Sequence, residues 1–287
     1  MGTYDYRFSI AGRGLALCLP RESRISEDFA PFRCEGPADL TVEFRPAETL
    51  PPLTGAPVFR GVGFSVFRQG EAFLRRYYEP AREDRPYAVS GLTPAGGTVR
   101  FLPEAERVFR EMNRCFLHVA LEELLLRWDR LILHASFVDS PYGGLLFSGP
   151  SGIGKSTQAA LWRDCRGSTV INGDKPILGR EAGVWTAWGS PFAGSSRCYV
   201  PRREPVAAIF LLEQGPDCRV ERLLPGESFR GLYAGTVINS WNRAYVKKAC
   251  DLLLDLACRV PVYRLRCTPD AAAVEAVERT LAKGEKA

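Results

Sequence analysis

Nine consecutive residues, Gly149 to Thr157, have the types and spacing of a phosphate-binding loop. They read GPSGIGKST, which fits the Walker A pattern G-x-x-x-x-G-K-[ST]. The glycines allow backbone conformations in which several N–H groups point inward, and the lysine adds a point charge for the β- and γ-phosphates. The residues that we expect to bind the nucleotide are Gly149, Ser151, Gly152, Ile153, Gly154, Lys155, Ser156 and Thr157.

The residues around the loop have the setting that this motif requires. An apolar strand over 145–148 precedes the loop, and a helix over 155–163 follows it. The N-terminus of that helix carries a partial positive charge, which favours phosphate. The hydroxyl of Ser156 is suited to Mg²⁺, so the pattern predicts binding of a nucleoside triphosphate, ATP, together with Mg²⁺.

Two acidic residues are candidates to complete such a site. Asp174 follows a short apolar strand over 169–171, and its carboxylate could hold Mg²⁺ or take a proton from an acceptor hydroxyl. The alternative for Asp174 is an exposed residue in an Asn-Gly turn. Glu213 follows the apolar run 206–212, which resembles a Walker B strand, and it is the second choice for a metal ligand.

Length and composition narrow the class of protein. The chain has 287 residues, of which 46% are apolar and 25% charged, and this balance excludes collagen-like, disordered and coiled-coil chains. Without a transmembrane run or a signal-peptide pattern, we expect a cytoplasmic protein with no membrane partner. The net charge of +5 is spread along the chain, which argues against nucleic-acid binding. Two histidines and nine cysteines without a C-x-x-C motif exclude a His-rich or zinc centre.

The chain is expected to form two domains of the α/β class. Residues 1–100 are rich in turn residues and alternating segments, and they predict a small antiparallel β domain with strands over 4–10, 40–45, 62–67 and 73–78. Residues 101–287 predict a P-loop domain that opens with one long helix over 103–124. Its further strands are expected over 131–138, 184–188 and 262–267, and its further helices over 244–258 and 269–283.

Three features together resemble the HPr kinase/phosphorylase family of phosphoenolpyruvate-carboxykinase-like P-loop proteins. They are His134 one strand before the loop, the loop itself, and Asp174 soon after it. The segments WGSPFAG at 188–194 and CYVPRR at 198–203, with the strand that leads to Glu213, are similar to HPr-kinase-like proteins of bacterial peptide-maturation clusters. The resemblance covers about residues 130–280 and implies a phosphoenolpyruvate-carboxykinase-like domain with a mixed sheet.

The resemblance also implies roles for individual residues. Asp174 would be the general base that activates a serine hydroxyl, and His134 would lie near the phosphates. Arg197, with Arg202 and Arg203, would contact phosphate or the acceptor. Those kinases usually carry two adjacent acidic residues, whereas here Gly173 precedes Asp174, so one carboxylate would serve both metal and base, or Glu213 would assist. The residues alone favour a core histidine at position 134 and a solvated loop residue at Arg197, and the resemblance raises the functional interpretation of His134 to equal weight.

The first functional hypothesis is therefore a kinase that transfers the γ-phosphate of ATP to a hydroxyl. Its catalytic residues would be Asp174, His134, Lys155 and Arg197, and its metal ligands Ser156, Asp174 and Glu213. The acceptor would be a serine of a small protein or peptide, or a small alcohol, and the protein could form homo-oligomers. Two alternatives stay open: a nucleotide-gated binding module without catalysis, and a carboxykinase-like enzyme, which would need an additional metal site with Lys and His ligands.

Overall fold

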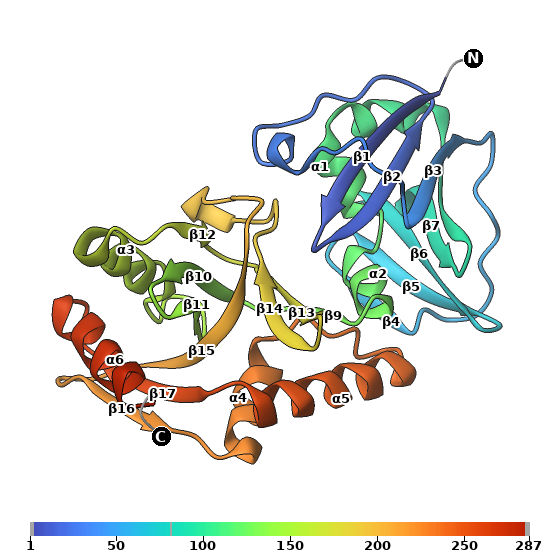
Figure 1. The fold of residues 1–287 in the computed structure, drawn as a ribbon. Helices are drawn as coiled ribbons and strands as arrows, with labels where there is room; N and C mark the ends of the chain where they lie inside the picture. The colour runs from blue at the N-terminus through green and yellow to red at the C-terminus, as the bar shows by residue number, and fades with distance from the viewer. Residues whose placement is uncertain (1–2, 81, 285–287) are drawn as a thin grey trace. The chain divides into compact units, whose positions relative to one another are not determined.

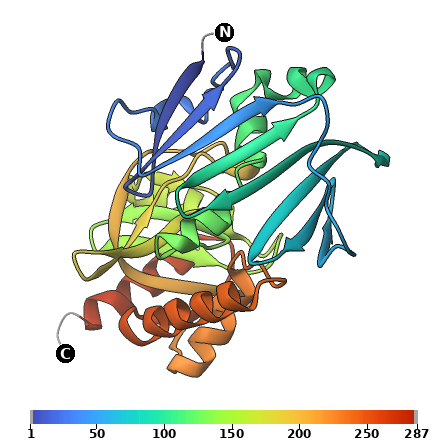
Figure 2. The ribbon, with the colours of Figure 1, turned by 90° about the vertical axis from the view of Figure 1, so that its right-hand side faces the viewer.

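The computed structural model describes residues 3–80 and 82–284, and this part of the chain divides into two compact units, Met1–Leu124 and Leu125–Ala287 (Figures 1 and 2). Both units contain a β-sheet and helices, so the protein is a mixed α/β protein. The division falls after Leu124 and not near residue 100, because the helical segment 103–124 packs with the first unit.

In the described part of the first unit, eight strands form one sheet in the order β1-β2-β3-β8-β7-β6-β5-β4. The strands are β1 (Tyr4–Ile10), β2 (Arg13–Leu19), β3 (Leu40–Pro46), β4 (Phe59–Gly61), β5 (Phe64–Gln69), β6 (Ala72–Glu79), β7 (Arg82–Thr93) and β8 (Gly96–Phe101). The sheet is mixed and not purely antiparallel, because β3 runs parallel to both β2 and β8. A long connection with the 3-10 helix η1 (Ala30–Phe32) joins β2 to β3, and such a connection permits parallel pairing.

The single helix expected over 103–124 is instead a series of short segments. They are the 3-10 helix η2 (Pro103–Arg110), α1 (Met112–Leu117) and α2 (Leu121–Arg127). The first break arises because Arg24 N–H donates to the Arg110 carbonyl (2.7 Å) and Met112 N–H donates to the Arg24 carbonyl (2.9 Å). The second break is at Ala120, whose φ is +56°. The apolar side chains of the pattern are nevertheless buried, among them Phe109, Cys115, Phe116 and Leu124.

In the second unit, the residues that the structure describes form a nine-stranded sheet whose main path is β12-β10-β11-β15-β14-β13-β9. Its strands are β9 (Arg130–Ile132), β10 (Ala135–Ser140), β11 (Gly143–Ser148), β12 (Val170–Asn172), β13 (Ile177–Glu181), β14 (Val184–Trp188), β15 (Arg203–Gln214), β16 (Arg219–Arg222) and β17 (Val262–Cys267). The sheet is mixed, as expected, since β15 is parallel to β11 and β17 but antiparallel to β14.

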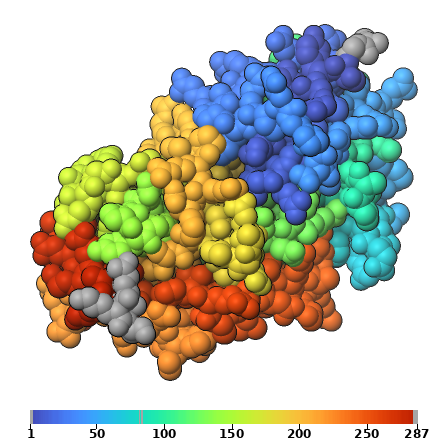
Figure 3. Space-filling model, viewed as in Figure 1, coloured from blue at the N-terminus to red at the C-terminus, as the bar shows by residue number. Residues whose placement is uncertain are grey.

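Helices cover both faces of this sheet. They are α3 (Lys155–Arg166), α4 (Pro225–Gly235), α5 (Arg243–Arg259) and α6 (Ala271–Gly284), and α5 and α6 form much of the orange and red surface in Figure 3. Neighbouring strand residues point to opposite faces. Phe147 packs in a cluster with Trp162 of α3 and Val277 of α6, whereas Leu146 packs in a second cluster with Leu253 of α5.

The direction of three neighbouring strands brings separate segments to one edge of the sheet. Strand β10 pairs antiparallel with β11 on one side and with β12 on the other, with Ala135 opposite Ser148 and Phe137 opposite Asn172. The start of β10 therefore lies beside the ends of β11 and β12. The residues that precede β10 and those that follow β11 and β12 meet at this edge. Along the described chain, no helix is long and apolar enough to span a bilayer.

Candidate functional site

The loop between β11 and α3 has positive φ angles at its three glycines, as expected from the sequence. Gly149, Gly152 and Gly154 have φ angles of +153°, +79° and +118°, which residues with a Cβ rarely adopt. Helix α3 begins at Lys155, directly after Gly154, with no side chain capping its N-terminus and no acidic residue in its first turn. The backbone N–H groups of that turn and the helix dipole therefore face the loop without a competing carboxylate.

Lys155 is held inside this loop. Its Nζ donates hydrogen bonds to the carbonyls of Gly149 and Pro150, both at 3.0 Å, and the residue is only 8% exposed. Burial lowers the pKa of the Lys155 ammonium, while the negative charge of Asp174 acts in the opposite direction. The buried Ser136 hydroxyl donates to the Lys155 carbonyl (2.8 Å) and so ties the start of α3 to β10.

His134 lies where the chain leaves β9 and enters β10. The expected strand over 131–138 is interrupted here, because the N–H of His134 donates to the Gly235 carbonyl (2.7 Å) and its carbonyl accepts from the Ser148 hydroxyl (2.9 Å). Its Nε2 lies 2.8 Å from Oδ1 of Asp174. The ammonium of Lys175 is 3.7 Å from the other oxygen, Oδ2. The carboxylate of Asp174 thus has a cationic or hydrogen-bonding group near each oxygen.

Asp174 is positioned by Asn172, a residue that the sequence analysis did not select. The fully buried side chain of Asn172 accepts from the N–H groups of Asp174 (3.0 Å) and Lys175 (2.8 Å) and donates to the Ser190 carbonyl (2.9 Å). The Asn-Gly turn that the sequence indicates is therefore present, but its asparagine faces the core. An Asn at the end of an apolar strand, two residues before an Asp, is the local signal for this turn.

The 3-10 helix η3 (Gly194–Ser196) packs against the turn that carries Asp174. A Cβ on Gly173 would lie only 1.8 Å from Ser196 Oγ, and a Cβ on Gly194 would lie 3.0 Å from Oδ2 of Asp174. Glycine is thus the only residue type that fits at position 173 against Ser196 in this arrangement. A second carboxylate at this position, as in the kinases that the sequence resembles, would collide with η3.

The loop and the Asp174 turn enclose a cavity of about 270 Å³. It is lined by His134, Ser151, Gly152, Gly154, Lys155, Ser156, Thr157, Gly173, Asp174, Ala193, Ser195 and Ser196. Most of the expected loop residues therefore face the same space as Asp174 and His134. The lining offers hydroxyls, backbone and one ammonium, which is the chemistry that binds phosphate groups.

Other residues selected from the sequence lie elsewhere. The side chain of Ile153 packs against the hydrophobic cluster around Phe147. Glu213 is half-exposed and lies 3.7 Å from Arg264, and it is not among the residues that line the cavity. Arg197 is exposed, has a φ of +53°, and is also outside the cavity lining.

The two further arginines of the pattern make ion pairs of their own. Arg202 Nη2 lies 2.8 Å from carboxylate oxygens of both Asp139 and Glu204, and Arg203 pairs with Glu181. The pairs with Asp139 and Glu181 link the beginning of β15 to β10 and β13. Neither arginine is among the residues that line the cavity.

The donors for Mg²⁺ in the cavity are few. Within residues 3–80 and 82–284, no group of three or more His, Cys, Asp or Glu side chains could hold a metal ion. The Ser156 hydroxyl and the Asp174 carboxylate line the same cavity. One carboxylate with a hydroxyl fits Mg²⁺ bound mainly by phosphate oxygens and water, not an ion held by protein ligands alone.

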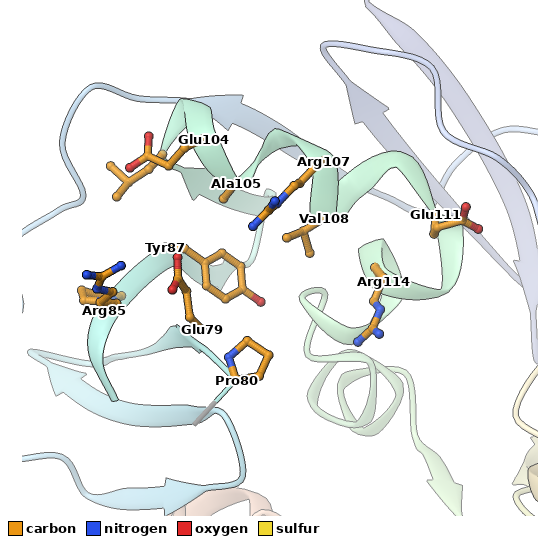
Figure 4. Close-up of a pocket in the computed structure, with 12 residues that line it drawn as sticks. Glu79, Pro80, Arg85, Tyr87, Glu104, Ala105, Arg107, Val108, Glu111 and Arg114 are labelled. Atoms are coloured by element: carbon orange, nitrogen blue, oxygen red, sulfur yellow. The ribbon is translucent and has the colours of Figure 1, made fainter. Parts of the chain in front are cut away.

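A larger cavity, of about 890 Å³, lies in the first unit (Figure 4). Its lining includes Tyr87, Arg107, Val108 and Arg114, and Figure 4 shows both arginine side chains extending from the helical segments. The Tyr87 hydroxyl is 2.8 Å from Nε2 of the buried His118. No residue selected from the sequence for chemistry is among those that line this cavity, so volume alone does not identify the site.

Comparisons with known proteins find a likeness among solved structures but none among family models or curated sequences. No protein-family model matches the chain, and no curated protein matches its sequence. Among solved structures, the model is similar to the HPr(Ser) kinase/phosphatase from Coxiella burnetii, with a TM-score of 0.32 and 16% sequence identity, over 54% of this chain and 90% of that one. A likeness with a TM-score and an identity this low carries no conclusion about the function of this chain.

Proposed function

We propose that the Leu125–Ala287 unit is an ATP-dependent phosphotransferase that moves the γ-phosphoryl group to a hydroxyl acceptor. The observation that carries the proposal is that Lys155, Ser156 and Asp174 line one polar cavity of about 270 Å³. Phosphoryl transfer needs positive charge around the phosphates and a base beside the acceptor hydroxyl, and these three residues supply the groups for both.

In this proposal, the glycine-rich loop and the start of α3 bind the phosphates of the nucleotide. The backbone N–H groups of the loop and those at the uncapped start of α3 would donate hydrogen bonds to the β- and γ-phosphates. The Lys155 ammonium would exchange the carbonyls of Gly149 and Pro150 for phosphate oxygens. Pockets that enclose whole small ligands usually have about 300–1,000 Å³. The cavity therefore suits the triphosphate tail, and the ribose and base would lie outside it.

The acceptor half depends on the Asp174 carboxylate. A hydroxyl that approaches Asp174 would give up its proton to the carboxylate while it attacks the γ-phosphorus. His134 would act as a positioning residue, because its Nε2 at 2.8 Å fixes Oδ1. Mg²⁺, held by Ser156, Asp174 and phosphate oxygens, would supply charge neutralisation at the phosphates.

The acceptor class is a serine of a small protein or peptide, or a small alcohol. The resemblance to kinases that modify a serine favours the first. The site itself requires only a hydroxyl that can reach Asp174.

Binding and transfer can be tested separately. We expect calorimetry to detect binding of ATP with Mg²⁺, and γ-labelled ATP to transfer its label to a hydroxyl compound. Lys155→Ala should weaken binding by about tenfold or more, because it removes the only ammonium in the cavity lining. Lys247→Ala is the matched control, since that lysine is highly exposed on α5 and pairs with Asp251 on the same helix.

Two results would contradict the proposal. Failure to bind any nucleoside triphosphate would exclude the phosphate-binding role of the loop. Tight binding without transfer or hydrolysis would favour the nucleotide-gated binding module over the kinase.

A further inference from the structure

Two adjacent serines, Ser195 and Ser196, line the cavity from the side of Asp174. Both belong to η3, the short segment that packs against the Asp174 turn. They are the only neighbouring pair of hydroxyls among the cavity residues outside the phosphate-binding loop and α3. A hydroxyl in this position raises the question of whether the protein carries its own phosphate acceptor.

The two serines differ in what their hydroxyls do. Ser196 Oγ donates to the Ala193 carbonyl (2.6 Å), accepts from the Cys198 N–H (3.3 Å), and fills the space beside Gly173. Ser195 is exposed, and within the part of the chain that the structure describes its hydroxyl has no hydrogen-bond partner. Ser196 is thus engaged in the fold of the segment, whereas the hydroxyl of Ser195 is available.

The backbone beside Ser195 touches the proposed base. The Cα of Gly194 is so close to Asp174 that a Cβ there would lie 3.0 Å from Oδ2. Gly194 and Arg197 have φ angles of +55° and +53°, so a left-handed residue stands on each side of the serine pair. The serine pair therefore lies in a short, tightly bent segment beside Asp174, and both serines line the cavity.

The direction of phosphoryl transfer selects Ser195 over the other hydroxyls of the cavity. Ser151, Ser156 and Thr157 belong to the loop and the start of α3, which would hold the phosphates. The attacking and leaving oxygens lie roughly in line across the γ-phosphorus. An acceptor must therefore enter from the Asp174 side, where Ser195 lies.

We propose that Ser195 is a self-phosphorylation site of this protein, an inference that rests on the proposed kinase function. The Ser195 Oγ forms a bond to the γ-phosphorus, and the bond from that phosphorus to the β–γ bridging oxygen breaks. The hydroxyl proton passes to the Asp174 carboxylate, and the nucleoside diphosphate leaves with the bonding electron pair. The product carries a phosphate on the segment that packs against Asp174.

The test uses the full chain with γ-labelled ATP and Mg²⁺ and no added acceptor. We expect label on Ser195, located by peptide mass spectrometry, and a loss of about tenfold or more in Ser195→Ala. The matched control is Ser240→Ala, which removes an exposed serine of the same unit that does not line the cavity, and it should keep the label on Ser195. Thermal unfolding of both variants checks that they are folded. Undiminished label in Ser195→Ala, or label on another residue, would overturn the proposal.

Dependence on protein concentration gives a second readout. Transfer within one chain predicts a fraction labelled per unit time that does not change on dilution. A rate that falls in proportion to protein concentration would show transfer between copies and would overturn the assignment to the chain's own site.

The failure of this proposal is distinguishable from that of the proposed function. If ATP binds and its label reaches an external hydroxyl compound but never Ser195, only the self-phosphorylation is excluded. If calorimetry detects no nucleoside triphosphate binding, both are excluded.

Discussion

His134 Nε2 and Asp174 Oδ1 lie 2.8 Å apart, although the two residues come from opposite ends of neighbouring strands. His134 precedes β10, and Asp174 follows β12, which pairs antiparallel with β10. Antiparallel pairing brings the start of one strand beside the end of the other. The glycine-rich loop 149–154 joins them because β11, on the other side of β10, also ends at this edge.

Removing the base should abolish transfer with little effect on binding. We predict that Asp174→Asn lowers kcat by about 10²–10⁴-fold, because the amide cannot take the acceptor proton, while ATP affinity changes only a few-fold. His134→Ala should lower kcat less, and the double variant should be no slower than Asp174→Asn, since His134 acts through the carboxylate. Steady-state kinetics with labelled ATP measures these values, and Asp251→Asn at an exposed position of α5 is the control.

Asn172 should affect activity only by holding the turn that positions Asp174. Asn172→Ala removes the acceptor of the Asp174 and Lys175 N–H groups, so we predict a loss of about 1–3 kcal/mol in the free energy of unfolding and a lower kcat. Asn172→Asp keeps an oxygen for both N–H groups and should recover part of kcat. Equal activity of the alanine variant and the unaltered protein would show that the turn holds Asp174 without this side chain.

The fit of Gly173 against Ser196 predicts a steric effect. Gly173→Ala should displace η3 or lower the free energy of unfolding by about 1–3 kcal/mol, because its Cβ would overlap the Ser196 hydroxyl. Gly226→Ala is the matched control, since a Cβ there meets no atom within 4 Å. Denaturant titrations of the two variants compare the stabilities, and equal stabilities would contradict this packing.

The lowered pKa of Lys155 predicts an alkaline limit for nucleotide binding. Only the protonated ammonium attracts phosphate, so affinity should fall as pH rises through this lowered pKa, at a pH below the 10.5 of an ordinary lysine. Lys155→Arg keeps its charge at these pH values, so its affinity should change little over the pH range in which the affinity of the unaltered protein falls. Calorimetry across this range measures both.

His118 should make stability depend on pH in the first unit. Burial lowers the pKa of His118 to about 4, so the folded protein keeps the ring neutral while the unfolded chain protonates near 6.5. The unfolded state binds more protons between these values, and stability is therefore lost as pH falls from about 6.5 to 4, by up to roughly 3 kcal/mol. Denaturant titrations at several pH values measure the free energy of unfolding. In His118→Phe this free energy should depend less on pH between 6.5 and 4, whatever the overall stability of the variant.

Patterns local in the chain were enough to predict many elements. The loop glycines, helix α3 and strands such as β14 and β17 lie close to the expected ranges, because backbone preferences and the alternation of apolar side chains act over a few residues. The apolar face of 103–124 is also buried as expected. The continuity of that helix was not predictable, since its first break depends on hydrogen bonds to Arg24, far away in the chain.

The amino-acid sequence by itself determined the glycine-rich loop before helix α3, because a run of glycines before a lysine and a helix is a local property. Only the tertiary structure decided which distant residues join that loop. Strand pairing brought His134 and Asp174 beside this loop and placed Glu213 near Arg264. The packing of η3 leaves room only for a glycine at position 173, and it places Ser195 at the cavity. Such contacts depend on the order and direction of strands across the sheet, which a local pattern does not encode.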